Sequence, residues 1–381
     1  MNSENLTAPV LQEIQGKGLG VLTLNSPRTL NALTLEMVET LDRILAEWEL
    51  DPTIQAVVLR GAGPRAFCAG GDVKRVALAL RDPETQYPEA FFTTEYRVDY
   101  RIRTYRKPLI VLGHGLVLGG GLGLLAGAPL RVITPETQLG MPEILIGLYP
   151  DVGGSHFLSR LPEGLGTFLA WTAARIGPRA ALALGLADFC IPETAFQPLL
   201  DALASAPSAE PDALSRLIRQ FSVPLDESNR DPFLAHAARA SHIARSPTPI
   251  EAAREFQSIL DTPGADPWLK ECATNFLEGS PTSAWVIQEQ LHRGEGLSLE
   301  KAFQMELDLS IQMGRLGTDF REGVRARLID KDNAPRWNPS TRDAIRPADI
   351  ARYFASPWTQ ATHPLRDLGN RKVDRVSKAS I

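Results

Sequence analysis

Two acidic residues in one apolar stretch of the chain could perform acid–base chemistry. Glu143 follows Met-Pro, and Asp151 follows Tyr-Pro eight residues later. The residues between them are largely apolar, which predicts carboxylates in partly dry surroundings. Burial raises the pKa of a carboxyl group, and a carboxyl group with a pKa near neutrality can act as an acid or a base. The alternative for Asp151 is structural: its side chain would cap a helix expected from about Val152.

Two glycine-rich loops could bring backbone N–H groups to the same ligand. Residues 61–71 follow a predicted strand, and a cluster follows the next one, consisting of Gly119, Gly120, Gly121 and Gly123. Glycine has no Cβ and therefore permits a close approach of the backbone. One N–H group from each loop could stabilise the oxyanion formed when a thioester carbonyl is attacked. A nearby carboxylate would then act as base or nucleophile.

Other kinds of active site match parts of the sequence less well. Residues 61–66 fit the dinucleotide-binding pattern G-x-G-x-x-A, but the loop continues to Asp72 where that motif requires a helix. Ser155 lies beside His156, outside a G-x-S-x-G frame. Cys68 and His114 could pair in space, yet no local signature of a cysteine nucleophile accompanies them. A nicotinamide cofactor and a nucleophilic serine or cysteine are therefore not favoured.

Length and composition limit the class of protein. The chain has 381 residues, 44% hydrophobic and 22% charged, with a net charge of −5, which is typical of a globular protein with a large core. It has no basic block, so we expect no nucleic-acid partner. No apolar run is long enough to span a membrane, so no membrane partner is expected.

The cysteines and the first twenty residues predict a cytoplasmic location. The three cysteines are widely spaced, which favours free thiols over a disulfide framework or a zinc site. The first twenty residues lack the charged start and apolar core of a signal peptide and the arginine-rich character of a transit peptide.

Hydrophobic periodicity predicts alternating strands and helices in the first half of the chain. Apolar runs of strand length cover residues 19–24, 54–59, 108–113 and 130–134, and helical patterns begin at Thr34, near Pro83 and after the glycine cluster. Near-continuous apolar strands are typical of an α/β arrangement whose sheet is buried on both faces.

The second half of the chain is predicted to be mainly helical. Residues 173–186 are expected to be mostly helical with a break at Gly177-Pro178, residues 204–212 to form a turn, and residues 249–328 to be helical. The tail from Pro335 is expected to be a partly ordered extension. We therefore divide the chain into a core with the active site, residues 1–200, and a helical C-terminal region with its extension, residues 201–381.

Several motifs together resemble the crotonase (enoyl-CoA hydratase/isomerase) superfamily. They are residues 66–73 (AFCAGGDV), the glycines at 119–121 and the stretch from Met141 to Gly154. The resemblance implies an α/β spiral of ββα turns, acyl-CoA substrates and an oxyanion hole made by the N–H groups of Gly71 and Gly120. It implies no metal or redox cofactor, since coenzyme A is part of the substrate.

One position departs from the hydratases of that superfamily. Their second catalytic glutamate corresponds to Gly123 here, so a hydratase with two glutamates is not expected. Residues 150–154 resemble instead the 3-hydroxyisobutyryl-CoA hydrolase subfamily. Three C-terminal segments share this resemblance, residues 320–326, 328–332 and 337–339.

The resemblance implies hydrolysis of a short β-hydroxyacyl-CoA thioester, with 3-hydroxyisobutyryl-CoA of valine breakdown as the expected substrate. Glu143 would attack the carbonyl or activate water, Asp151 would assist, and Glu95 would bind the β-hydroxyl group. The residues beside the first loop are further candidates for substrate binding, with the two cations facing the CoA phosphates: Gly71, Asp72, Val73, Lys74 and Arg75. A lyase or isomerase using the same oxyanion hole and a non-catalytic CoA-binding protein remain alternatives. The acyl group and homo-oligomerisation stay open.

Overall fold

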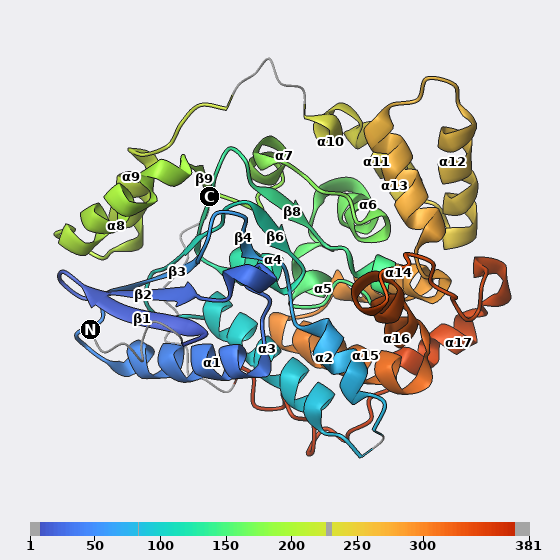
Figure 1. The fold of residues 1–381 in the computed structure, drawn as a ribbon, viewed down its shortest axis with the longest axis horizontal. Coiled ribbons are helices and arrows are strands. Elements are labelled where there is room, and N and C mark those ends of the chain that lie inside the picture. Colours follow the sequence, from blue (N-terminus) through green and yellow to red (C-terminus); the bar gives the residue numbers. More distant parts are fainter. Residues whose placement is uncertain (1–7, 83, 226–230, 370–381) are drawn as a thin grey trace.

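The computed structural model describes residues 8–82, 84–225 and 231–369. Its larger sheet has six strands in the order β1-β2-β3-β5-β7-β9 (Figure 1). Only β1 and β2 pair antiparallel, and all other neighbours are parallel. The strands are β1 (Val10–Gln15), β2 (Leu19–Leu24), β3 (Ala56–Gly61), β5 (Leu109–Leu112), β7 (Leu130–Ile133) and β9 (Phe189–Cys190).

A smaller parallel sheet is formed by three short strands that lie between those of the larger sheet in sequence. These are β4 (Ala66–Cys68), β6 (Leu116–Leu118) and β8 (Gln138–Gly140). Three successive segments of the chain therefore give one strand to each sheet, as β3–β4, β5–β6 and β7–β8. This repeat confirms the predicted α/β spiral of ββα turns.

Both faces of the larger sheet are buried. Alternate residues of one strand belong to different hydrophobic clusters, with Val57 and Leu59 on one side and Val58 on the other. Helices α1 (Leu35–Leu50) and α3 (Tyr87–Arg103) cover the first face, and α8 (Phe196–Ser205) and α9 (Pro211–Arg219) cover the second (Figure 1). Burial on both faces explains why these strands are continuously apolar.

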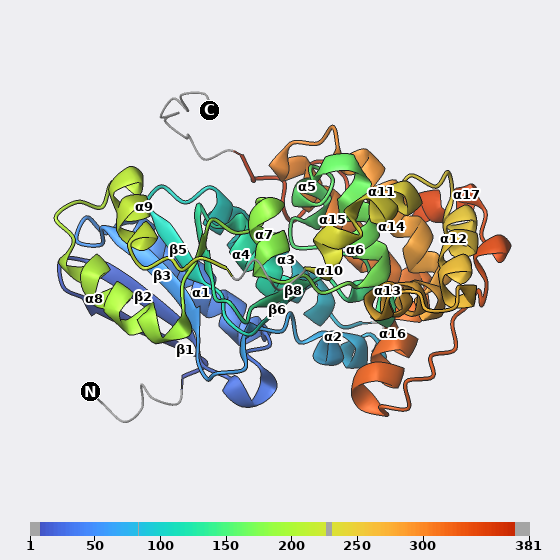
Figure 2. The same ribbon diagram turned by 90° about the horizontal axis from the view of Figure 1, so that it is seen from above.

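The remaining helices surround the smaller sheet and extend away from the larger one. Figure 2 shows the C-terminal helices at the end of the molecule opposite α8 and α9. The helices are α2 (Val73–Ala79), α4 (Gly120–Gly127), α5 (Gly154–Phe157), α6 (Leu165–Thr172), α7 (Pro178–Ala183), α10 (Pro232–Ala235), α11 (Ala237–Ala244), α12 (Pro249–Asp261), α13 (Pro267–Glu278), α14 (Pro281–Gly294), α15 (Leu299–Leu316), α16 (Asp319–Val324) and α17 (Pro347–Ala351). None of the helices in the described ranges is both long and apolar enough to cross a membrane.

The four predicted strands are confirmed, whereas β1 and the short strands were missed. The four predicted strands are β2, β3, β5 and β7, and the side chain of Thr34 caps α1 by accepting a hydrogen bond from the N–H of Met37. Strands β4 and β6 lie where the sequence predicted only loops. Each has three residues and gains its pairing from neighbouring strands, so its own pattern carries little signal.

The second half differs from expectation in two segments. Of residues 173–186 only α7 is an α-helix, because Ala173 takes a left-handed conformation that ends α6. The tail packs against the body of the protein, and the side chain of Leu365 is fully buried. Residues 370–381 and the first seven lie outside the described residues. The boundary at residue 200 stays a prediction; Tyr96 and Phe303, on either side of it, share one buried cluster.

Candidate active site

The two glycine-rich loops meet at the end of the smaller sheet. A Cβ atom placed on Gly120 would lie 3.4 Å from the backbone nitrogen of Gly71. Within the described chain neither of these two N–H groups donates a hydrogen bond. Gly120 is the first residue of α4, where a helix leaves its N–H groups without intrahelical acceptors. After Gly71, the N–H group of the next residue, Asp72, donates to the carbonyl oxygen of Leu33. Two neighbouring donors are therefore available to a ligand.

Glycine is required here because two carboxyl groups lie against the same loop. A Cβ on Gly119 would lie 2.8 Å from Glu143 Oε1, and one on Gly120 would lie 2.7 Å from Glu95 Oε1. Gly119 also has a φ of 51°, which a residue with a side chain rarely adopts. The absence of side chains thus lets both acids approach the backbone donors.

Glu143 is a buried acid with an unused oxygen. It opens a short 3-10 turn, η3 (Glu143–Ile146), after Pro142, and only 5% of it is exposed. Its Oε2 atom has no hydrogen-bond partner among the described residues. Burial, followed by the nearby charge of Asp151, raises the pKa of Glu143 well above its usual value. The group is thus suited to take up a proton.

Asp151 is also buried, and its carboxylate binds a tyrosine. The Tyr96 hydroxyl donates to Asp151 Oδ2 at 2.7 Å and lies 2.6 Å from Ser310 Oγ. Burial raises the pKa of Asp151 to about 6, while the hydrogen bond from Tyr96 opposes that rise. Helix α5 begins at Gly154 with Gly153 as its N-cap, so the alternative that the Asp151 side chain caps this helix is wrong.

The loop that carries Asp151 is held by side chains from the C-terminal half. Glu306 on α15 accepts from the N–H groups of Gly153 and Ser155, both at 2.8 Å. Gln290 on α14 donates to the carbonyl oxygen of Pro150 and to Ser155 Oγ. These bonds satisfy backbone groups of a buried loop, which would otherwise be costly to leave without partners.

These supporting residues were not predicted from the sequence. Tyr96, Gln290, Glu306 and Ser310 lie among apolar residues at helical spacing on α3, α14 and α15. Polar residues on an otherwise apolar helix face were a signal that could have found them, since buried polar groups are normally hydrogen-bonded.

Two residues of the C-terminal half, Ser280 and Gly323, brace the turn of Glu143. The N–H of Ser280 donates to the carbonyl oxygen of Ile144 at 3.0 Å. A Cβ on Gly323 of α16 would lie only 2.4 Å from the backbone of Ile146, so this helix packs directly on η3. The loops that carry Glu143 and Asp151 therefore both contact the C-terminal half, which fixes their positions.

Glu95 joins the two acids at the same place. It lies on the buried face of α3 and is 3% exposed, and its Oε1 atom has no partner within the described ranges. Burial raises the pKa of Glu95 well above its usual value, and the charges of Asp151 and Glu143 raise it further. Three carboxyl groups, two N–H donors and a tyrosine hydroxyl therefore converge on one site.

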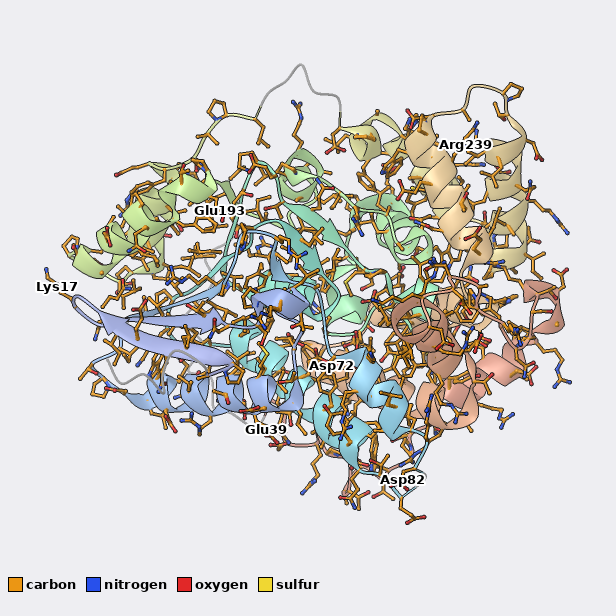
Figure 3. All side chains as sticks on the ribbon, in the orientation of Figure 1. Lys17, Glu39, Asp72, Asp82, Glu193 and Arg239 are labelled. Carbon is orange, nitrogen blue, oxygen red and sulfur yellow. The ribbon has the colours of Figure 1, made fainter. Side chains whose placement is uncertain are left out.

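The other predicted binding residues begin α2. The Asp72 side chain caps this helix by accepting from the N–H of Arg75 at 3.1 Å, and Val73 is the first helical residue. Lys74 and Arg75 are exposed, and the Arg75 guanidinium lies over the ring of Tyr87. In the view of Figure 3, Asp72 lies near the middle of the outline and Asp82 at its lower edge. Asp72 thus has a structural task, and the two cations are open to solvent beside the site.

The position of Gly123 leaves no room for a side chain. A Cβ there would lie 2.5 Å from Val152 Cβ and 2.9 Å from the Val152 carbonyl oxygen. Val152 itself is buried with a φ of 51°, in the loop that Glu306 holds. A glutamate at position 123 would therefore require the Asp151 loop to move.

The alternative nucleophiles are not built into the structure. Burial raises the pKa of Cys68 to about 12, which leaves its thiol protonated. His114 lies 2.7 Å from the carbonyl oxygen of Gly63 through Nε2. The glycine pattern at residues 61–66 leads into strand β4 instead of the helix that a dinucleotide site needs.

Curated relatives match nearly the whole chain. The 3-hydroxyisobutyryl-CoA hydrolase, mitochondrial, of Danio rerio is 37% identical over 93% of this chain and 92% of its own. The protein of the same name from Gallus gallus is 35% identical over 89% and 86%. Both names specify the mitochondrion, so the prediction of a cytoplasmic location is wrong. Free buried cysteines fit any reducing compartment and could not distinguish the two.

A solved structure and a family model agree with these relatives. The crystal structure of a carnitinyl-CoA dehydratase from Mycobacterium thermoresistibile matches with a TM-score of 0.82, at 32% identity, over 92% of this chain and 97% of that one. The model of the family described as enoyl-CoA hydratase/isomerase matches residues 19–354. Together with the ββα spiral and the paired glycine loops, these matches show that the chain belongs to the enoyl-CoA hydratase/isomerase family.

Proposed function

We propose that this protein hydrolyses the thioester of a short β-hydroxyacyl-CoA, with 3-hydroxyisobutyryl-CoA of valine breakdown as its substrate. The observation that carries the proposal is the convergence of two free N–H donors on Glu143, with no room for a second acid at Gly123. The names of the curated relatives support the choice of substrate.

In the proposed mechanism the N–H groups of Gly71 and Gly120 bind the thioester oxygen. They stabilise the negative charge that forms when the carbonyl carbon is attacked, and each such donor contributes roughly 10² to 10³ in rate. Glu143 either attacks the carbonyl or removes a proton from the attacking water. Both routes need its carboxylate, which lies against Gly119 beside the donors.

Asp151 assists by placing its own negative charge near Glu143 and by holding the Tyr96 hydroxyl through a hydrogen bond. Its pKa of about 6 leaves it largely ionised at neutral pH. Burial and the charge of Asp151 raise the pKa of Glu143, so the Glu143 carboxylate, once ionised, is a stronger base than an exposed glutamate. Free CoA and the carboxylate of the acyl group are the products.

A panel of short acyl-CoAs tests the reaction class. We expect the purified protein to release free thiol from 3-hydroxyisobutyryl-CoA and to hydrate crotonyl-CoA little or not at all. The comparison matters because one similar structure is named a dehydratase. Efficient hydration without thiol release would establish a lyase and overturn the proposal, and binding without either reaction would indicate a CoA-binding protein.

Glu95 is the proposed ligand of the substrate's β-hydroxyl group. We expect Glu95→Gln to slow hydrolysis of 3-hydroxyisobutyryl-CoA more than that of isobutyryl-CoA. A site that hydrogen-bonds a hydroxyl group discriminates strongly between substrates with and without it, and the variant loses part of that discrimination. The ratio of kcat/KM values for the two substrates measures the effect, with Glu89→Gln, a half-buried residue in the first turn of α3, as control. An unchanged ratio would remove Glu95 from substrate recognition.

The coenzyme A part of the substrate is proposed to lie beside α2, where the side chains of Lys74 and Arg75 are exposed. A reaction without a metal or redox cofactor and an association of this chain into homo-oligomers stay predictions.

A further inference from the structure

Asp99 is a buried acid that the proposed reaction does not use. It lies on α3 one helical turn after Glu95 and is 2% exposed. Neither oxygen of its carboxyl group has a hydrogen-bond partner in the described part of the chain. Buried carboxyl groups are normally satisfied, so two unused oxygens require an explanation.

A small cavity borders Asp99 and leads away from the acid cluster. Its volume is about 40 Å³, and it lies between α3, α4, the loop of Val152, α5 and α15. The lining residues that matter here are Asp99, Arg103, Gly123, Gly127, Val152 and His156. A cavity needs at least roughly 10–15 Å³ of such volume to hold one water, so this one is large enough for ordered water. Waters there would satisfy the carboxyl oxygens of Asp99.

The far side of the cavity reaches the surface of the protein. His156 is only half-buried and Arg103 is exposed, whereas Asp99, Gly123 and Val152 are buried. Residues on one helix that are four apart face the same side, so Glu95 and Asp99 are neighbours. The order from the inside outward is therefore the acid cluster with Glu95, then Asp99, then the cavity, and finally His156 near the surface.

We infer that Asp99 and the cavity form the route by which the proton produced by thioester hydrolysis leaves the buried acid cluster. The inference rests on the proposed function. Hydrolysis adds water across the carbonyl–sulfur bond, giving a thiol and a carboxylic acid, and the acid then releases one proton at neutral pH. That proton must leave the cluster before the next turnover.

Asp99 can pass a proton on without a net change in its own state. It accepts the proton on one oxygen while its other oxygen donates a proton to water in the cavity, and water carries it past His156 to solvent. Burial raises the pKa of Asp99 well above its usual value, and the negative charges of Glu95, Asp151 and Glu306 raise it further. Burial and the nearby Arg160 and Arg103 lower the pKa of His156 to about 4, so this residue does not retain the proton.

The test separates the first turnover from the steady state. In Asp99→Asn the side chain keeps its shape but carries no exchangeable charge, so we expect a first-turnover rate like that of the wild type in rapid mixing. The steady-state rate should fall about tenfold, less than the roughly 10² expected for a group that acts on the substrate. Added imidazole should restore the steady-state rate of the variant and leave the wild type unaffected. Asp82→Asn, at an exposed residue that follows α2, is the matched control.

Two results would overturn the inference: an unchanged steady-state rate, or equal losses in both phases without rescue by imidazole, which indicate a structural role. If Asp99→Asn does not fold, Gly127→Ala replaces it, because a Cβ there meets its nearest atoms at 3.6 Å and narrows the cavity. The same slow, imidazole-rescued steady state is expected, and its absence counts against the route. Thiol release by the wild type tests the proposed function separately, so failure of one is distinguishable from failure of the other.

Discussion

Glu143→Gln is expected to lower thioester turnover by at least about 10², the low end for loss of acid–base catalysis. Glutamine keeps the shape of the side chain but can neither attack the carbonyl nor accept a proton. Binding of CoA should persist, because the coenzyme A part of the substrate is proposed to contact other residues of the site. Steady-state kinetics and calorimetric titration with CoA measure the two effects. Glu136→Gln, an exposed residue in the turn before β8, is the control.

The pH dependence has a defined sign. A carboxyl group with a raised pKa ionises only at higher pH, so kcat/KM should rise with pH through the raised pKa of Glu143 and fall below about pH 6, where Asp151 takes up a proton. The raised pKa also means that the folded protein holds this proton more tightly than the unfolded chain. Stability is therefore lost as the pH rises through that pKa, and Glu143→Gln should be more stable than the wild type at alkaline pH.

Asp151→Asn extends the same test to the second acid. The variant should also be slow, and the double variant should be little slower than the poorer single one, because residues that act as a unit give non-additive losses. Wild-type rates in Asp151→Asn would leave Glu143 to act alone. Wild-type rates in Glu143→Gln would contradict the mechanism as a whole.

Gly120→Pro is expected to reduce turnover by roughly 10² to 10³, because proline has no N–H group to hold the oxyanion. Proline is tolerated at the first position of a helix, which Gly120 occupies in α4. The variant is therefore expected to fold, and circular dichroism checks that it does.

The matched control for this change is Gly120→Ala. Alanine keeps the N–H group but adds a Cβ that would lie 2.7 Å from Glu95 Oε1, so it reports the steric cost alone. The difference in kcat/KM between the two variants isolates the donor. If the alanine and proline variants are equally slow, the loss arises from displaced Glu95, and Gly120 is not an oxyanion donor.

The sequence by itself determined four strands of the larger sheet and the family. Residues of strands buried on both faces are apolar without interruption, so β2, β3, β5 and β7 were recognisable from a short window. The capping side chain of Thr34 is local in the same sense. The glycine clusters, Glu143 and Gly123 lie in contiguous motifs, and for that reason the resemblance to the crotonase superfamily could be read directly and is confirmed by the family match.

Only the tertiary structure decided how the site is held together. Tyr96, Asp151 and Ser310 form one hydrogen-bonded group although they come from α3, a loop and α15. Val152 fills the space beside Gly123, and Glu306 binds the backbone of the next residue, Gly153, from more than a hundred residues away. Such bonds depend on which helices pack together, and a local pattern contains no record of its distant partner. The three-residue strands β4, β6 and β8 were missed for the same reason, because their stability comes from pairing with neighbours and not from their own residues.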